Sequence, residues 1–118
     1  MHELAVCQGL MSQVEQIAQR ENAERVTRIL LNIGPLSGVE AQLLADAFPI
    51  ASAGSVAEGA QLVIEQLPIR VACLSCGAES DASANRLLCG ACGDYRTRLL
   101  SGDEMLLTSL ELERRQRA

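Results

Sequence analysis

The sequence predicts an α+β fold in which a small three-stranded mixed sheet packs against two helices and carries an inserted four-cysteine module. Apolar residues recur at helical spacing in two segments, at residues 4–18 and 43–48. Three other segments have the composition of strands, and two Cys-x-x-Cys pairs stand between the second and the third of them. With 118 residues, 48% of them hydrophobic, the chain is long enough for one core plus such an appendage.

The first helix is predicted from about Glu3 to Glu21. Its apolar residues follow one another in steps of three and four, as on one face of an amphipathic helix; they are Leu4, Cys7, Met11, Val14 and Ala18. Because Cys7 lies within this stripe, we interpret it as a small core residue rather than a ligand.

The segment "ERVTRILLNIG" predicts a strand that ends at Gly34-Pro35. One face of that strand would carry Thr27, Ile29, Leu31 and Ile33, and the opposite face is mixed. The helix after it is expected to begin at "LSGVE", where Ser37 and Glu40 have the spacing of a capping box. It would point Leu43, Leu44, Ala47 and Phe48 inward. Pro49 should kink or stop it.

The small residues of 51–60 predict a connection, and "QLVIEQL" predicts a second strand that Pro68 breaks or bends before "IRVAC". Strand, helix and strand in this order favour a right-handed crossover between parallel neighbours. After a loop at residues 101–103, "EMLLTSLELE" predicts the last strand, with Leu106, Leu110 and Leu112 on one face. We therefore expect a domain of residues 1–70 plus 101–118, and a cysteine domain of residues 71–100 inserted before the last strand.

Composition argues against several classes of function. The net charge is −5, all ten basic residues are arginine, and only Phe48 and Tyr95 are aromatic. Nucleic-acid binding favours basic patches and stacking rings, so nucleic acid is not an expected partner. No apolar run approaches the roughly 20 residues needed to cross a bilayer, and the N-terminus does not resemble a signal peptide. We expect a cytoplasmic protein without a membrane partner.

Four of the five cysteines form the pattern C-x2-C-x12-C-x2-C, made of Cys73, Cys76, Cys89 and Cys92. Two residues between cysteines let both thiolates of a pair reach one ion, and paired cysteines in a cytoplasmic chain indicate metal before disulfide. Gly77 and Gly93 follow the pairs and permit turns that aim backbone N–H groups at the sulfurs. Four thiolates predict a closed, structural zinc site with no position for an activated water. Such a site is not catalytic.

Other interpretations of the cysteines stay open from the sequence alone. Disulfides or free thiols are one, and a rubredoxin-like iron site is another, although the aromatic shell that such sites normally have is missing. A zinc ribbon can also serve as an adaptor for protein or nucleic acid. Residues 73–98, however, contain three arginines and three carboxylates, so the local net charge is zero, which does not favour nucleic-acid binding.

The chain's only histidine, His2, follows Met1 directly. If Met1 keeps a free amine, that amine, the backbone nitrogen of His2 and one imidazole nitrogen can close two chelate rings on one ion. Three nitrogens in a plane suit nickel(II) or copper(II), and the backbone or carboxylate of Glu3 could complete the shell. An N-terminal histidine alone is a weak signal, so this hypothesis depends on the rest of the chain.

Three stretches in the same order give the whole chain a resemblance to a known family. The opening "MHELAVCQGL", the "GPLSGVE" segment and the late CxxC…CxxC module followed by "LSGDEMLLTSLELE" resemble the HypA/HybF family, the nickel metallochaperones of hydrogenase maturation. The resemblance implies nickel as transferred cargo at Met1, His2 and Glu3, and structural zinc at the four cysteines. It implies no enzymatic activity. Departures are the "CGAC" pair, Cys7 in the first helix and Pro49, none of which touches the ligand set.

The resemblance also implies partners. The family works with the GTPase HypB to deliver nickel to the large subunit of [NiFe]-hydrogenase, and some members also serve urease. An adaptor of the zinc-ribbon class, in which Met1 and His2 have no role, is the alternative.

Overall fold

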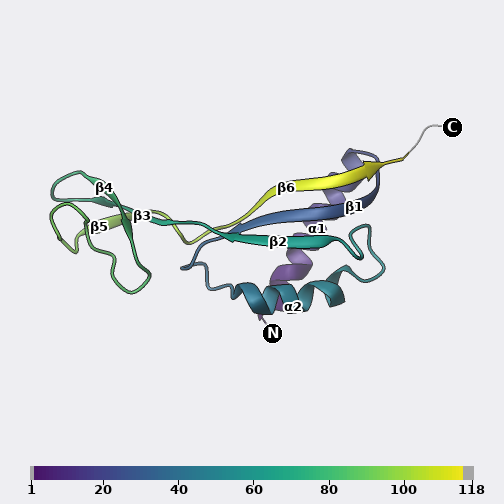
Figure 1. The fold of residues 1–118 in the computed structure, drawn as a ribbon, viewed down its shortest axis with the longest axis horizontal. Helices are drawn as coiled ribbons and strands as arrows, with labels where there is room; N and C mark the ends of the chain where they lie inside the picture. The colour runs from purple at the N-terminus through teal and green to yellow at the C-terminus, as the bar shows by residue number, and fades with distance from the viewer. Residues whose placement is uncertain (1, 116–118) are drawn as a thin grey trace. The chain divides into compact units, whose positions relative to one another are not determined.

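The structure, a computed structural model, describes residues 2–115 (Figure 1). Its elements in chain order are α1 (His2–Arg20), β1 (Ala23–Ile33), α2 (Ala41–Ser52), β2 (Gln61–Gln66), β3 (Ile69–Cys73), β4 (Glu79–Ala82), β5 (Thr97–Ser101) and β6 (Met105–Arg114). The strands form two three-stranded sheets with the orders β2-β1-β6 and β4-β3-β5. Two helices, a small sheet and an inserted cysteine module confirm the predicted fold class.

The chain divides into two compact units. The helical unit comprises Met1–Leu31, Val39–Ile64 and Leu107–Ala118, and the cysteine unit comprises Asn32–Gly38 and Glu65–Leu106. Each unit has its own three-stranded sheet as scaffold, although the ends of β1, β2 and β6 extend into the cysteine unit. Neither α1 nor α2 is long and apolar enough to cross a membrane.

The first sheet is mixed, with β1 in the centre. β1 and β2 run in the same direction, because the N–H of Val26 donates to Val56 and the N–H of Leu67 donates to Ile33. β6 runs the opposite way, because the N–H of Gly34 donates to Glu104 at 2.8 Å while that of Arg115 donates to Asn22 at 3.0 Å. The last strand thus returns to the sheet of the first two, as expected from its leucines.

The core of the helical unit is aliphatic apart from Phe48, in keeping with the composition. α1 buries Cys7, Leu10, Met11, Val14 and Ala18, and it packs against α2. The predicted stripe of α1 is confirmed apart from Leu4, which is half-buried. Cys7 has no exposed surface, and burial raises the pKa of its thiol. Its core role is therefore also confirmed.

The start of α2 differs from the prediction. The helix begins at Ala41, its N-cap is Glu40, and the Glu40 side chain makes no capping hydrogen bond. Gly38 has φ +78°, a left-handed conformation that separates Ser37 from the helix, so the capping box of Ser37 and Glu40 does not form. Instead, a carboxylate oxygen of Glu3 accepts a hydrogen bond from the N–H of Glu40 at 3.3 Å.

The buried stripe of α2 is narrower than predicted. Leu44 and Phe48 are buried, but Leu43 is 50% exposed, so its inward placement was wrong. Residues four apart share one face of a helix, whereas a neighbour lies about 100° away around the axis. Pro49 does not stop the helix, which continues to Ser52.

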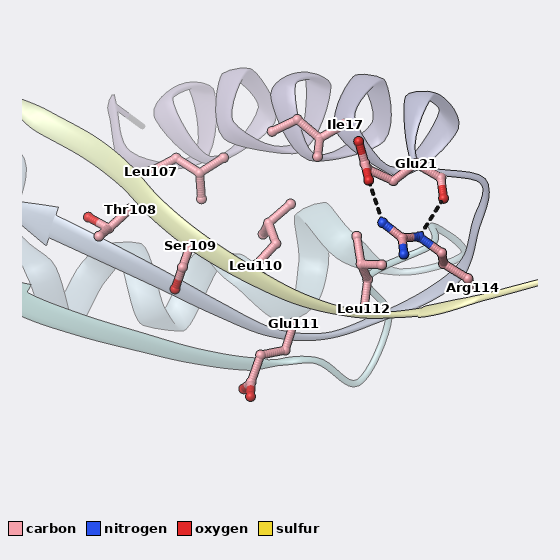
Figure 2. Close-up of a pocket in the computed structure, with 9 residues that line it drawn as sticks. All are labelled: Ile17, Glu21, Leu107, Thr108, Ser109, Leu110, Glu111, Leu112 and Arg114. Carbon is pink, nitrogen blue, oxygen red and sulfur yellow. Dashed lines mark hydrogen bonds and ion pairs between the residues drawn. The ribbon is translucent and has the colours of Figure 1, made fainter.

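The face assignment of β6 was also wrong. Leu106 is 47% exposed, and Leu107 takes its place with Leu110 and Leu112 on the half-buried face. Thr108 and Ser109 are both exposed, so the alternation slips by one residue between Leu107 and Leu110. Figure 2 shows Leu107 and Leu110 on the side of β6 that faces α1.

Leu44→Ala tests the position of this stripe. The leucine side chain is fully buried, so its truncation should lower the free energy of unfolding by about 2–5 kcal/mol. Leu43→Ala, one residue away and half exposed, is the matched control and should cost less than about 1 kcal/mol. Urea denaturation of both variants measures the difference, and equal losses would contradict the stripe.

Candidate metal centre

The sheet of the cysteine unit positions the first cysteine pair. Its central strand β3 runs antiparallel to β4, with Ile69 opposite Ala82, and antiparallel to β5, with Cys73 opposite Thr97. Cys73 is the last residue of β3, so the strand leads directly into the first knuckle. Sequence patterns did not indicate β4 and β5, because the "ESDA" of β4 has no apolar alternation.

The first knuckle, residues 73–77, folds around one sulfur. Sγ of Cys73 accepts hydrogen bonds from the N–H groups of Ser75 and Cys76, each at 3.3 Å. The N–H of Gly77 donates to the carbonyl of Cys73 at 3.1 Å, and Gly77 has φ +78°. Glycine closes this turn because it adopts a positive φ without steric cost.

The second knuckle, residues 89–93, repeats this geometry. Sγ of Cys89 accepts hydrogen bonds from the N–H groups of Ala91 at 3.3 Å and Cys92 at 3.4 Å. The N–H of Gly93 donates to the carbonyl of Cys89 at 2.9 Å, and Gly93 again has φ +78°. The turn role predicted for both glycines is therefore confirmed.

The two knuckles bring four sulfurs together. Sγ of Cys73 lies 3.6 Å from Sγ of Cys92, and Sγ of Cys76 lies 3.6 Å from Sγ of Cys89. All four sulfurs lie within 4.8 Å of one another, and none is joined in a disulfide. Zinc–sulfur bonds of about 2.3 Å in a tetrahedron separate the sulfurs by ~3.8 Å. The spacing therefore fits one four-coordinate metal ion.

The environment of the sulfurs favours thiolate at the first cysteine of each knuckle. The N–H groups of Cys92 and Ala91 lower the pKa of Cys89 to about 6, and that of Cys76 lowers the pKa of Cys73. At Cys92 the N–H of Asp94 acts in the same direction, but the neighbouring sulfurs, Cys73 first, outweigh it and raise the pKa to about 12. Four sulfurs this close cannot all ionise without a cation.

Asp94 is a residue of this site that the sequence analysis counted only as a charge. Its carboxylate accepts a hydrogen bond from the hydroxyl of Ser75 in the first knuckle. It also accepts one from the backbone N–H of Arg96 at 3.0 Å and pairs with the Arg96 guanidinium at 3.1 Å. The Ser75 hydroxyl, followed by Arg96, holds the pKa of the Asp94 carboxyl well below its usual range. In the sequence, only the position of Asp94 directly after Cys92-Gly93 could have indicated that it belongs to the site.

At the other candidate site, α1 begins with His2 and Glu3 side by side. Nδ1 of His2 lies 3.3 Å from a carboxylate oxygen of Glu3, and their side chains are 59% and 16% exposed. The same oxygen accepts the N–H of Glu40, and this bond, followed by His2, lowers the pKa of Glu3. The predicted third ligand, Met1, lies outside the described residues.

A groove of about 720 Å³ contains none of the predicted ligands. Figure 2 shows it between α1 and β6 in the helical unit, where a Glu21–Arg114 ion pair of 2.7 Å closes one end. Besides that ion pair, its lining consists of four aliphatic and three polar residues: Ile17, Leu107, Leu110, Leu112, Thr108, Ser109 and Glu111. In residues 2–115, the four cysteines are the one group of three or more ligating side chains close enough to share a metal ion, whereas the start of α1 brings together two, His2 and Glu3.

Comparison with known proteins assigns the chain to a family. The family described as "Hydrogenase/urease nickel incorporation, metallochaperone, hypA" matches residues 1–112. The hydrogenase maturation factor HypA of Nitrosospira multiformis is 50% identical over 112 residues, which cover 95% of this chain and 97% of that protein. HypA of Aquifex aeolicus is 42% identical over 113 residues, with coverage of 96% and 98%.

A solved structure agrees with this assignment. The solution structure of the Ni metallochaperone HypA from Helicobacter pylori has a TM-score of 0.73 and 25% identity, covering 96% of this chain and 98% of that one. Family, relatives and fold coincide over almost the entire length. The chain belongs to the HypA family, the nickel metallochaperones of hydrogenase maturation, whose members carry a metal and are not enzymes.

Proposed function

We propose that this protein binds Ni(II) at its N-terminus through the Met1 amine, His2 and Glu3. It then delivers the ion, together with a HypB-type GTPase, to the large subunit of [NiFe]-hydrogenase in the cytoplasm. The observation that supports this most directly is the 3.3 Å separation between Nδ1 of His2 and the Glu3 carboxylate at the start of α1. The match to a family of nickel-incorporation metallochaperones supports nickel as the ion that this pair of side chains would bind.

The chemistry of a helix start suits such a site. The first N–H groups of an α-helix have no acceptor within the helix, so the backbone nitrogen of His2 is not needed for the helical hydrogen bonds. Nδ1 and that backbone nitrogen can close a six-membered ring on one ion, and the Met1 amine would add a five-membered ring. Nickel(II) favours this tetragonal nitrogen and oxygen geometry. The Glu3 carboxylate, next to Nδ1, is available as a further ligand.

Exposure supports a carrier rather than a storage site. The His2 side chain is 59% exposed, so a ligand of a recipient protein can reach a bound ion without unfolding the chain. Delivery then proceeds by stepwise replacement of ligands in the recipient's favour. Service to urease is the other destination within this family's description.

We also propose that Cys73, Cys76, Cys89 and Cys92 hold structural Zn(II) in a domain of residues 71–100, and that nickel binds in the remainder, residues 1–70 plus 101–118. The 3.6 Å sulfur separations fit tetrahedral thiolate coordination, which leaves no vacant position. Bound zinc would contribute on the order of 10 kcal/mol of apparent folding free energy to that domain.

Two changes test the nickel site. His2→Ala, or acetylation of the Met1 amine, should abolish the binding of about one nickel per chain, because each removes a nitrogen donor from the chelate. Isothermal titration of the untagged protein with nickel measures the loss.

Gln8→Ala, an exposed change on the same helix, is the control and should leave nickel binding intact. Far-ultraviolet circular dichroism verifies that α1 persists in all variants. Nickel uptake that survives both the His2 change and the acetylation would disprove the proposed site.

A second experiment tests the zinc site. Cys89→Ser should lose most of its bound zinc and unfold the cysteine unit, because loss of one of four thiolates weakens zinc binding and with it the folding free energy that zinc supplies. Cys7→Ala, which removes the one thiol outside the cluster, should retain a full equivalent of zinc. Elemental analysis of the purified proteins gives the metal content. Equal zinc in both variants would exclude the four-sulfur site.

A further inference from the structure

We propose that Asp94 is the positioning residue of the four-cysteine site. It ties the two knuckles to each other, which fixes the spacing between their sulfurs and so favours zinc over nickel there. This inference rests on the zinc site proposed above and assigns a role to a residue that is not itself a ligand.

Asp94 holds the first knuckle through its side chain. One carboxylate oxygen accepts the hydroxyl of Ser75, which lies between Cys73 and Cys76. The N–H of the same Ser75 donates to Sγ of Cys73 at 3.3 Å. Ser75 therefore connects the Asp94 carboxylate to Sγ of Cys73, and through Ser75 the carboxylate restrains the position of that sulfur.

Asp94 holds the second knuckle through its main chain. Its carbonyl accepts the N–H of Cys89 at 3.0 Å, at the residue where that knuckle begins. In the first knuckle the equivalent bond runs from the N–H of Cys73 to the carbonyl of Ala78 at 2.9 Å. Ala78 has no side chain that could reach across, so only the second knuckle carries this additional connection.

Arg96 completes the connection. Its backbone N–H donates to one carboxylate oxygen of Asp94 at 3.0 Å, and its guanidinium reaches the other at 3.1 Å. The carbonyl of Arg96 accepts the N–H of Leu74 in the first knuckle at 2.8 Å. The Asp94 side chain is only 16% exposed, so water competes weakly for these bonds.

These contacts restrain the separation between sulfurs of different knuckles, which neither knuckle determines by itself. Each knuckle fixes its own turn through its glycine and its N–H groups to sulfur, but two sulfur–sulfur separations of 3.6 Å join different knuckles. Tetrahedral zinc needs these separations to stay near ~3.8 Å. Nickel in a plane of four sulfurs would require the knuckles to turn relative to each other, and the Asp94 connection opposes that turn.

The test uses the full chain carrying His2→Ala, so that nickel can report only on the cysteines. Asp94→Ala should transfer zinc to a chromogenic chelator about 10- to 100-fold faster than this parent, the usual effect of removing a residue that orients metal ligands. On incubation with nickel it should also develop the thiolate-to-nickel absorption that the parent lacks.

Asp81→Ala is the matched control. This aspartate lies in the same unit and also pairs with an arginine, Arg70, at 3.0 Å, but its partner is not part of either knuckle. Its zinc transfer and nickel absorption should equal those of the parent. Ser75→Ala removes only the hydroxyl, so it keeps the test decisive if Asp94→Ala does not fold, and it should change both readouts in the same direction.

The outcomes separate the two proposals. A parent that contains zinc, with Asp94→Ala and Ser75→Ala matching its transfer rate and staying free of nickel absorption, overturns the role of Asp94 alone. Faster zinc transfer without nickel absorption overturns the metal preference. A parent that purifies without zinc overturns the zinc site and this inference together.

Discussion

Four sulfurs within 4.8 Å of one another are the constraint on which the cysteine unit depends. Thiolates at this distance repel strongly, so the cluster must keep protons or bind a cation. Backbone N–H groups aimed at Cys73 and Cys89 offset part of that charge, and each turn closes at a glycine with φ +78°. The sheet of β3, β4 and β5 is short, and four shared ligands would give such a small unit the cohesion that its few apolar residues do not provide.

Features with a local cause could be predicted from the sequence. The stripe of α1 depends on spacing along one helix, and the knuckles depend on Cys-x-x-Cys followed by glycine, so both follow from neighbouring residues. The return of the last strand to the first sheet could also be predicted, because its leucines must be buried somewhere.

Features that depend on distant residues could not be predicted. The slip that replaces Leu106 by Leu107 on the half-buried face could not be predicted, because the two adjacent leucines are equally apolar and either can face the core. The capping box failed because Gly38 turns the chain and the carboxylate that meets the N–H of Glu40 comes from Glu3, 37 residues earlier. Asp94 was missed for the same reason: its partner Ser75 lies 19 residues away.

One oxygen atom at the start of α1 serves two partners. The Glu3 carboxylate faces Nδ1 of His2 and also satisfies the N–H that precedes α2, which has no side-chain cap of its own. A cation bound to this oxygen would compete with the N–H of Glu40 for it, and thermodynamic linkage would make the effect reciprocal. Binding and release of nickel at the proposed site would then alter the hydrogen bond that precedes the first turn of α2.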